Sequence, residues 1–175
     1  MTAQQNLSVM ISEEQLAERI QGLGAEIQAH YNGEPVAVIG VLKGCFLFLA
    51  DLCRHLHEDV TIDFLGLSSY SGTASTGVVR LTSDLKVDIQ GKHVLIVEDI
   101  VDTGLTMQYL LKMLKTREPA SLAVCTLLDK PSRRKAPVHV DFCGFSIQDR
   151  FVVGYGLDLD ERYRNLPYIA EVLFD

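Results

Sequence analysis

Three carboxylates stand close together in the stretch VLIVEDIVDTGLTM, which runs from Val94 to Met107. Glu98, Asp99 and Asp102 follow directly on an apolar run that is typical of a buried strand. Carboxylates in such a group can hold Mg²⁺, bind sugar hydroxyls or exchange a proton with a substrate. A single acidic residue before a helix is usually a cap, but three of them interleaved with β-branched residues indicate a site.

The segment from Asp102 to Thr106 predicts an anion-binding turn. It precedes a helical pattern, so it offers backbone N–H groups, two threonine hydroxyls and the positive end of a helix dipole. Its spacing matches neither the Walker loop nor the Rossmann glycine pattern. Because carboxylates repel phosphate, we expect Glu98 and Asp99 to face another part of the ligand, such as sugar hydroxyls or Mg²⁺.

Strand and helix patterns alternate around this stretch. Residues 11–33 predict an opening helix, with Ser12 as N-cap and Gln15 closing a capping box. Apolar strand patterns cover residues 35–42, 60–70, 78–85, 92–100, 121–129 and 138–147, and helical patterns cover residues 45–56 and 106–118. The alternation predicts an α/β fold with an open, mostly parallel sheet flanked by helices.

Ligands of an open α/β sheet bind beyond the carboxyl ends of its strands. We expect Glu98 and Asp99 at such an end, at the exit of a strand formed by Val94–Val97. The glycine-rich segment from Ser68 to Gly77 also follows a strand pattern, and its small polar residues are typical of a mobile loop. This loop would start at the mouth of the same crevice.

Composition narrows the class of protein. The chain has 175 residues with 47% hydrophobic and 22% charged residues, which predicts one globular domain. A net charge of −7 argues against sequence-independent binding to nucleic acid. The sequence shows no signal peptide and no membrane-spanning run, so we expect a cytoplasmic protein with no membrane partner. We expect its isolated cysteines to be reduced: Cys45, Cys53, Cys125 and Cys143.

The stretch from Val94 to Met107 is similar to the phosphoribosyl pyrophosphate motif of the type I phosphoribosyltransferases, in the form found in their hypoxanthine-guanine branch. Four further segments match in order over nearly the whole chain: LKG at Leu42–Gly44, SSY at Ser68–Tyr70, LLDK ending in Lys130, and FVVGYGLDLDERYRNLP from Phe151. The combination of Lys130 with FVVGYGLD is specific to enzymes that act on 6-oxopurines.

This resemblance implies an enzyme of purine salvage. It would transfer the 5-phosphoribosyl group from phosphoribosyl pyrophosphate to N9 of hypoxanthine or guanine, giving IMP or GMP and pyrophosphate, with Mg²⁺ as cofactor. Residues 1–175 would form a single domain, with a hood built mainly from residues 150–175 and the N-terminal segment. The family forms dimers and tetramers, so we expect a homodimer or homotetramer, and the motifs look bacterial.

The matched positions imply roles for individual residues. Glu98 and Asp99 would hold the ribose hydroxyls and lie near Mg²⁺, and Asp102 would exchange a proton with N7 of the purine. The ribose and 5′-phosphate would be bound by Glu98, Asp99, Asp102, Thr103, Gly104, Leu105 and Thr106. Pyrophosphate would be bound by Lys43, Gly44, Ser69, Tyr70 and Arg164, with a Leu42–Lys43 peptide bond that can be cis in the family. We expect Arg162 to be a surface charge.

The later segments would read the base. Lys130 would donate to the purine O6 and so reject adenine, which carries an amino donor there. Phe151 would stack on the purine, and Val152 would contribute backbone groups. Asp158 would lie near the base and bind a second Mg²⁺. We expect Tyr155 to serve in packing, and the preference among hypoxanthine, guanine and xanthine stays open.

A pyrimidine-operon regulator of the same fold is the main alternative, since it also has this cradle but acts by binding RNA. Its loop lacks an aspartate at the position of Asp102 and carries an arginine where this chain has Leu105. Adenine and orotate transferases share the cradle without the Lys130 and FVVGYGLD pair. A nucleotide-binding module without catalysis fits less well, because the acid/base and pyrophosphate positions are all filled.

Overall fold

The computed structural model describes residues 6–57, 59–69 and 79–174, with two sheets and three α-helices among them. The elements are β1 (Asn6–Ile11), α1 (Glu13–Tyr31), β2 (Val36–Leu42), α2 (Phe46–Cys53), β3 (Val60–Ser69), β4 (Val79–Ser83), β5 (His93–Val101), α3 (Leu105–Lys115), β6 (Ser121–Asp129), the short 3₁₀ helix η1 (Pro131–Arg133), β7 (Phe142–Ser146), β8 (Val152–Val153) and β9 (Ile169–Leu173). The chain therefore alternates strand and helix through its middle, as predicted.

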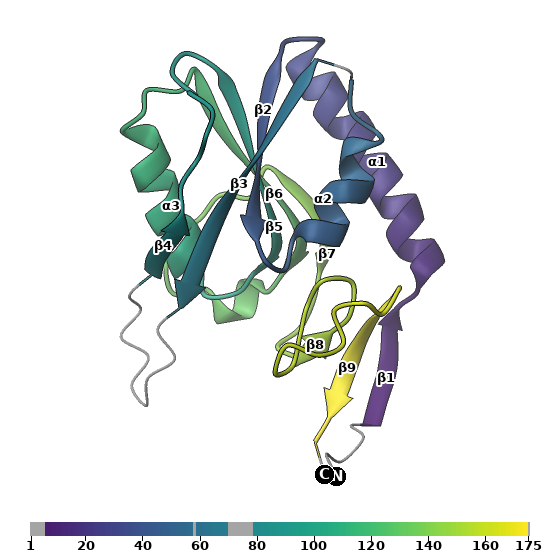
Figure 1. The fold of residues 1–175 in the computed structure, drawn as a ribbon. Coiled ribbons are helices and arrows are strands. Elements are labelled where there is room, and N and C mark those ends of the chain that lie inside the picture. Colours follow the sequence, from purple (N-terminus) through teal and green to yellow (C-terminus); the bar gives the residue numbers. More distant parts are fainter. Residues whose placement is uncertain (1–5, 58, 70–78, 175) are drawn as a thin grey trace.

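The larger sheet has the strand order β4-β3-β2-β5-β6-β7. All neighbours in it are parallel except β3 and β4. This arrangement confirms the predicted α/β fold with a mostly parallel sheet. The strands β2 and β5 lie at its centre, so the loops that follow them meet at one edge (Figure 1).

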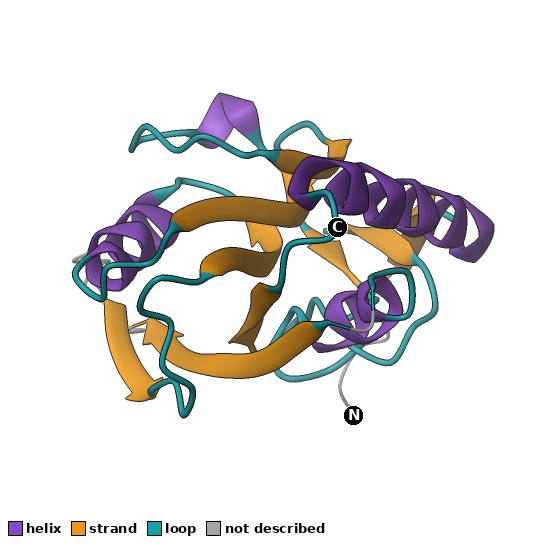
Figure 2. Ribbon diagram, turned by 90° about the horizontal axis from the view of Figure 1, so that it is seen from above, coloured by secondary structure: helices purple, strands orange, loops and turns teal. Residues whose placement is uncertain are grey.

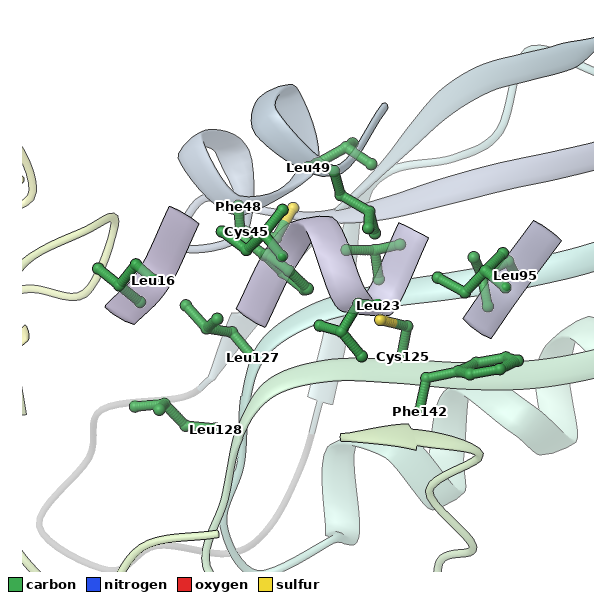
Figure 3. Close-up of a cluster of buried hydrophobic side chains, with 14 of the residues drawn as sticks. Leu16, Leu23, Cys45, Phe48, Leu49, Leu95, Cys125, Leu127, Leu128 and Phe142 are labelled. Atoms are coloured by element: carbon green, nitrogen blue, oxygen red, sulfur yellow. The ribbon is translucent and has the colours of Figure 1, made fainter. Parts of the chain in front are cut away.

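Helices cover both faces of this sheet (Figure 2). On one face, Leu16 and Leu23 of α1 and Phe48 of α2 are buried with residues of β5 and β6, such as Leu95 and Cys125 (Figure 3). On the other face, α3 packs its buried side chains Met107, Leu110 and Leu114 against the alternate residues of the same strands. Two-sided burial explains why these strands read as continuous apolar runs.

The first helix begins as its sequence predicts. The Ser12 hydroxyl accepts the N–H of Gln15, and the Gln15 side chain accepts the Ser12 N–H at 2.9 Å, which completes the capping box. The helix ends at Tyr31, and Asn32 and Gly33 follow in left-handed conformation. This well-defined helix closes one face of the core.

Two predictions about the strands were wrong. The strand β5 runs to Val101, so Glu98 and Asp99 lie inside it and not at its exit. Its pairing with β6 continues past the carboxylates, because Ile100 and Val101 still have partners there. The strand β7 begins only at Phe142, since the Asp141 side chain bonds the β6 backbone at Val124.

A small second sheet has the order β1-β9-β8. It brings the first and last described segments of the chain together beside the main sheet (Figure 1). The chain between β8 and β9, residues 154–168, reaches the carboxyl ends of β2 and β5, where Gly156 lies against Gly44. No helix in the described part of the chain combines the length and apolar character that a membrane crossing requires.

Candidate active site

A cavity of about 470 Å³ lies at the carboxyl ends of the central strands. Residues from β2, β5 and the 154–168 segment line it, among them Lys43, Gly44, Glu98, Asp99, Asp158 and Arg164. A second cavity of about 190 Å³ shares Glu98, Asp99 and Thr106 with it and extends over the Asp102–Gly104 turn. The two cavities place the predicted ribose carboxylates between the predicted phosphate and pyrophosphate sites.

The carboxylates of Glu98 and Asp99 are poorly solvated. Burial raises the pKa of Glu98 well above its usual value, and the neighbouring Asp99 charge raises it further. Burial also raises the pKa of Asp99, although hydrogen bonding to its carboxylate opposes this shift. Glu98 Oε2 is buried without a hydrogen-bond partner among the described residues, and a bound ligand would satisfy it.

Two close approaches connect the central loops. A Cβ added to Gly44 would lie 1.6 Å from Asp99 Oδ2, and one added to Gly156 would lie 2.0 Å from the Gly44 carbonyl oxygen. The Leu42–Lys43 peptide bond before them is cis. Positions 44 and 156 therefore have no room for a Cβ atom, and any side chain there would displace the Asp99 carboxylate or the neighbouring loop.

The turn from Asp102 to Thr106 leads into α3 as predicted. Gly104 is the N-cap residue with φ +81°, and a Cβ there would lie 2.7 Å from the Ala136 carbonyl oxygen. The helix begins at Leu105, so its first N–H groups lack intrahelical acceptors and open toward the 190 Å³ cavity. The turn can bind a phosphate.

Two arginines that the sequence reading missed hold this turn. Arg134 donates to the Asp102 carbonyl oxygen at 2.8 Å and forms an ion pair with Asp129, with both side chains largely buried. Arg133 Nε lies 3.2 Å from Asp102 Oδ1, and this pair is half exposed. The proximity of the Asp102 carboxylate raises the pKa of Arg133. The run of basic residues after Lys130 was the available signal.

Of the four predicted base-reading residues, Lys130, Phe151 and Val152 lie beside the turn, whereas Asp158 lines the 470 Å³ cavity with Arg164. Lys130 is buried, and its Nζ donates to the Arg150 carbonyl oxygen at 2.6 Å, directly before Phe151. Phe151 is 44% exposed and packs edge-on against Phe174, so part of its ring is accessible for stacking. Val152 is buried in β8, where its backbone holds the segment in place.

The predicted pyrophosphate residues meet on the other side of the carboxylates. Arg164 Nη2 lies 2.8 Å from Asp158 Oδ1, and Lys43 Nζ lies 3.0 Å from Glu161 Oε1. Glu161 was not predicted as a site residue. Ser69 ends β3, and Tyr70 and most of the predicted loop from Ser68 to Gly77 lie outside the described residues.

Two expectations about neighbouring residues are also settled by contacts. Tyr155 is buried, and its hydroxyl donates to Asp51 of α2, so its ring packs while its hydroxyl ties the 154–168 segment to that helix. Arg162 is exposed and lies over the Tyr163 ring, as expected of a surface charge.

Metal binding was predicted for Glu98, Asp99 and Asp158. Within the described residues, no group of three or more histidine, cysteine or acidic side chains is arranged as a metal site. Mg²⁺ is usually held by one or two carboxylates together with waters and substrate phosphates. The unpartnered Glu98 oxygen beside Asp99 is a donor set of that kind.

Comparison with known proteins agrees with this architecture. Residues 10–160 match the family model described as a phosphoribosyl transferase domain. The chain belongs to this family of phosphoribosyltransferases, and the family resemblance predicted from its motifs is confirmed.

The relatives cover nearly the full chain. A protein from Escherichia coli K12 named hypoxanthine phosphoribosyltransferase is 51% identical over 95% of this chain and 96% of its own. One from Bacillus subtilis named hypoxanthine-guanine phosphoribosyltransferase is 48% identical, over 93% of this chain and 91% of its own. A crystal structure of a hypoxanthine-guanine phosphoribosyltransferase from Bacillus anthracis is 49% identical, has a TM-score of 0.92, and covers 97% of this chain and 100% of its own.

A structure from Trypanosoma cruzi extends the comparison. It is a hypoxanthine phosphoribosyltransferase in complex with the product IMP, and it is 42% identical with a TM-score of 0.89. The match covers 97% of this chain and 95% of that chain. These relatives are transferases, which favours the enzyme over the RNA-binding regulator.

Proposed function

We propose that the protein transfers the 5-phosphoribosyl group from phosphoribosyl pyrophosphate to N9 of hypoxanthine or guanine, releasing pyrophosphate. The observation that carries this proposal is the order of groups along one edge of the sheet. The carboxylates Glu98 and Asp99 separate a phosphate-binding turn from the cations Lys43 and Arg164. This order fits a ribose between its 5′-phosphate and its pyrophosphate.

The carboxylates act on the ribose. As the bond from C1′ to the pyrophosphate oxygen breaks, positive charge develops on the sugar, and Glu98 and Asp99 stabilise it electrostatically. The same side chains accept hydrogen bonds from the 2′- and 3′-hydroxyls and so fix the ring. We propose that Mg²⁺ binds with the substrate, near Glu98 and Asp99 and near Asp158, and offsets the charge of the leaving pyrophosphate.

Asp102 acts on the purine. We propose that its carboxylate exchanges a proton with N7 while N9 forms the new bond to C1′. The support is its position between the phosphate turn and Lys130, with a side chain that is 39% exposed. Thr103, Gly104 and Thr106, which line the smaller cavity, hold the 5′-phosphate together with the backbone of Leu105 at the start of α3.

Base selection rests on Lys130 and the segment after it. The Lys130 ammonium carries three donors; one is bonded to the Arg150 carbonyl oxygen and Asp149 lies 3.9 Å away, so a further donor can reach the purine O6. Adenine would present its amino group there and leave the ammonium unsatisfied. Phe151 stacks on the base, Val152 supplies backbone groups to its edge, and Asp158 lies nearby.

The proposed pyrophosphate site consists of Lys43, Gly44, Ser69, Tyr70 and Arg164. Arg164 Nε is buried without a hydrogen-bond partner among the described residues, which supports a ligand-binding role. We propose that residues 1–175 act as one catalytic unit, with the small sheet as a hood over this edge. We place it in the cytoplasm, where its four free thiols stay reduced.

We infer that the enzyme is a homodimer or homotetramer. Phe46 of α2 and Ile62 and Phe64 of β3 are each 38–46% exposed, and they lie on neighbouring elements. Covering such apolar side chains with a second copy would remove them from water. Sedimentation of the wild type and of Ile62→Glu tests this, and a monomeric wild type would contradict it.

One assay tests the catalytic proposal. Purified protein is incubated with phosphoribosyl pyrophosphate, Mg²⁺ and, in turn, hypoxanthine, guanine, xanthine, adenine and orotate. We expect nucleotide and pyrophosphate from hypoxanthine or guanine. The proposal would be contradicted if only adenine or orotate gave nucleotide, or if none of the bases did. Tight RNA binding without turnover would favour the regulator.

A further inference from the structure

The Glu161 carboxylate lies between the two cations of the proposed pyrophosphate site. Its oxygens are 3.0 and 3.1 Å from Lys43 Nζ, and Oε2 is also 3.2 Å from Arg164 Nη2. All three residues line the 470 Å³ cavity. The mechanism above uses Lys43 and Arg164 but assigns nothing to Glu161.

The backbone is bent so that this side chain reaches the cations. The Glu161 N–H donates to Asp158 Oδ2 at 2.9 Å, while the other Asp158 oxygen pairs with Arg164. Asp160, Glu161 and Tyr163 have positive φ angles of 53°, 62° and 74°. Left-handed conformations are unfavourable for residues with side chains, and they persist where the surroundings impose them, often at functional sites.

The ion pair between Lys43 and Glu161 can be replaced by contacts to a ligand at little cost in stability. The side chains of Lys43 and Glu161 are 68% and 64% exposed, and exposed ion pairs contribute little to stability. The two cations also lower the pKa of Glu161, so the carboxylate is ionised when the site is free. A diphosphate carries more charge and more acceptor oxygens than one carboxylate, and therefore competes well for the same donors.

We propose that Glu161 is an internal competitor of pyrophosphate: its carboxylate pairs with Lys43 and Arg164 in the free enzyme and leaves them when a diphosphate group binds. This inference rests on the proposed function, in which these two cations bind pyrophosphate. The competition weakens binding of free pyrophosphate. After transfer, the return of Glu161 to the cations favours release of the product.

Calorimetric binding of magnesium pyrophosphate to the purified enzyme tests this inference. Glu161→Gln removes the charge and keeps the shape, and Asp160→Asn removes an adjacent, exposed charge as a matched control. We expect about three- to tenfold tighter binding for Glu161→Gln, as for the loss of two exposed ion pairs, and less than a twofold change for Asp160→Asn. If the substitution only disrupted the turn around Glu161, pyrophosphate binding would become weaker and not tighter.

A double-mutant cycle assigns the effect to the contact. In the Lys43→Gln background, Glu161→Gln should increase pyrophosphate affinity by a smaller factor than in the wild type, because one of its two partners is absent. If Glu161→Gln still forms nucleotide but binds magnesium pyrophosphate no more tightly than Asp160→Asn does, the competition by Glu161 is excluded. The proposed function would still stand in that case. Failure of the wild type both to bind magnesium pyrophosphate and to form nucleotide would overturn the proposed function with it.

Discussion

The Cα atom of Gly44 lies directly against the Asp99 carboxylate, so a Cβ at this position would be 1.6 Å from Oδ2. The loop after β2 and the strand β5 thus form one closely fitted unit at the centre of the site. This contact couples the proposed pyrophosphate loop to Glu98 and Asp99, the proposed ribose-binding carboxylates. A change in one displaces the other.

Gly44→Ala should therefore impair catalysis more than stability. Displacement of Asp99 and Lys43 by about 1 Å should lower kcat/KM for phosphoribosyl pyrophosphate by about 10²-fold. Gly22→Ala in α1 is the control, since its Cβ would meet only the flexible end of Arg19, at 3.3 Å. Steady-state kinetics of both variants provide the measurement, and wild-type kinetics in Gly44→Ala would contradict the close fit.

Glu98→Gln should stabilise the free protein while reducing its activity. Above the raised Glu98 pKa the amide removes a buried charge, and we expect a gain there of about 1–2 kcal/mol, or about 2–8 °C in Tm, without Mg²⁺. Because burial raises the Glu98 pKa, the wild-type carboxyl becomes neutral as the pH falls. The Tm difference should then shrink as the pH is lowered. A lower Tm for the variant above the Glu98 pKa would contradict this account.

Lys130→Gln should relax the choice of base. The amide can accept as well as donate, so the ratio of kcat/KM for hypoxanthine to that for adenine should fall by about tenfold or more. Lys135→Gln removes an exposed charge nearby and should leave the ratio unchanged. If both variants keep the wild-type ratio, another group reads the 6-position.

The adjacent residues Arg133 and Arg134 should contribute differently to the free energy of unfolding. Arg134→Gln breaks a largely buried ion pair and a hydrogen bond to the phosphate turn, so we expect a loss of about 3 kcal/mol in the free energy of unfolding. Arg133→Gln breaks exposed pairs and should cost less than about 1 kcal/mol. Urea unfolding of both variants makes the comparison, and equal losses would contradict the assigned burial.

The sequence predicted those parts of the molecule that local patterns control. The capping box at Ser12 and Gln15 and the strand β6 were found because caps and two-sided burial leave local signals. The motif residues from Glu98 to Gly104 and Thr106 line the cavities at the sheet edge. Their assigned ligand contacts stay predictions.

Long-range contacts were not predictable in the same way. The pairing of Lys43 with Glu161 spans 118 residues, and the contact of Gly156 with Gly44 depends on how the small sheet docks. The strand pattern over residues 92–100 already contained Glu98 and Asp99, but they were expected at the exit of the strand; pairing of β5 with β6 continues to Val101 and places them inside it. Tertiary pairing decided that boundary.

The central claim is that this site transfers a phosphoribosyl group with Asp102 as the group that serves N7. The most direct measurement is the rate of IMP formation by the wild type and by Asp102→Asn, with phosphoribosyl pyrophosphate, Mg²⁺ and hypoxanthine. We expect turnover in the wild type, and in the variant a kcat lower by about 10²-fold or more with little change in the KM for phosphoribosyl pyrophosphate. Near-normal turnover in Asp102→Asn would contradict the role of Asp102, and no IMP from the wild type would contradict the account as a whole.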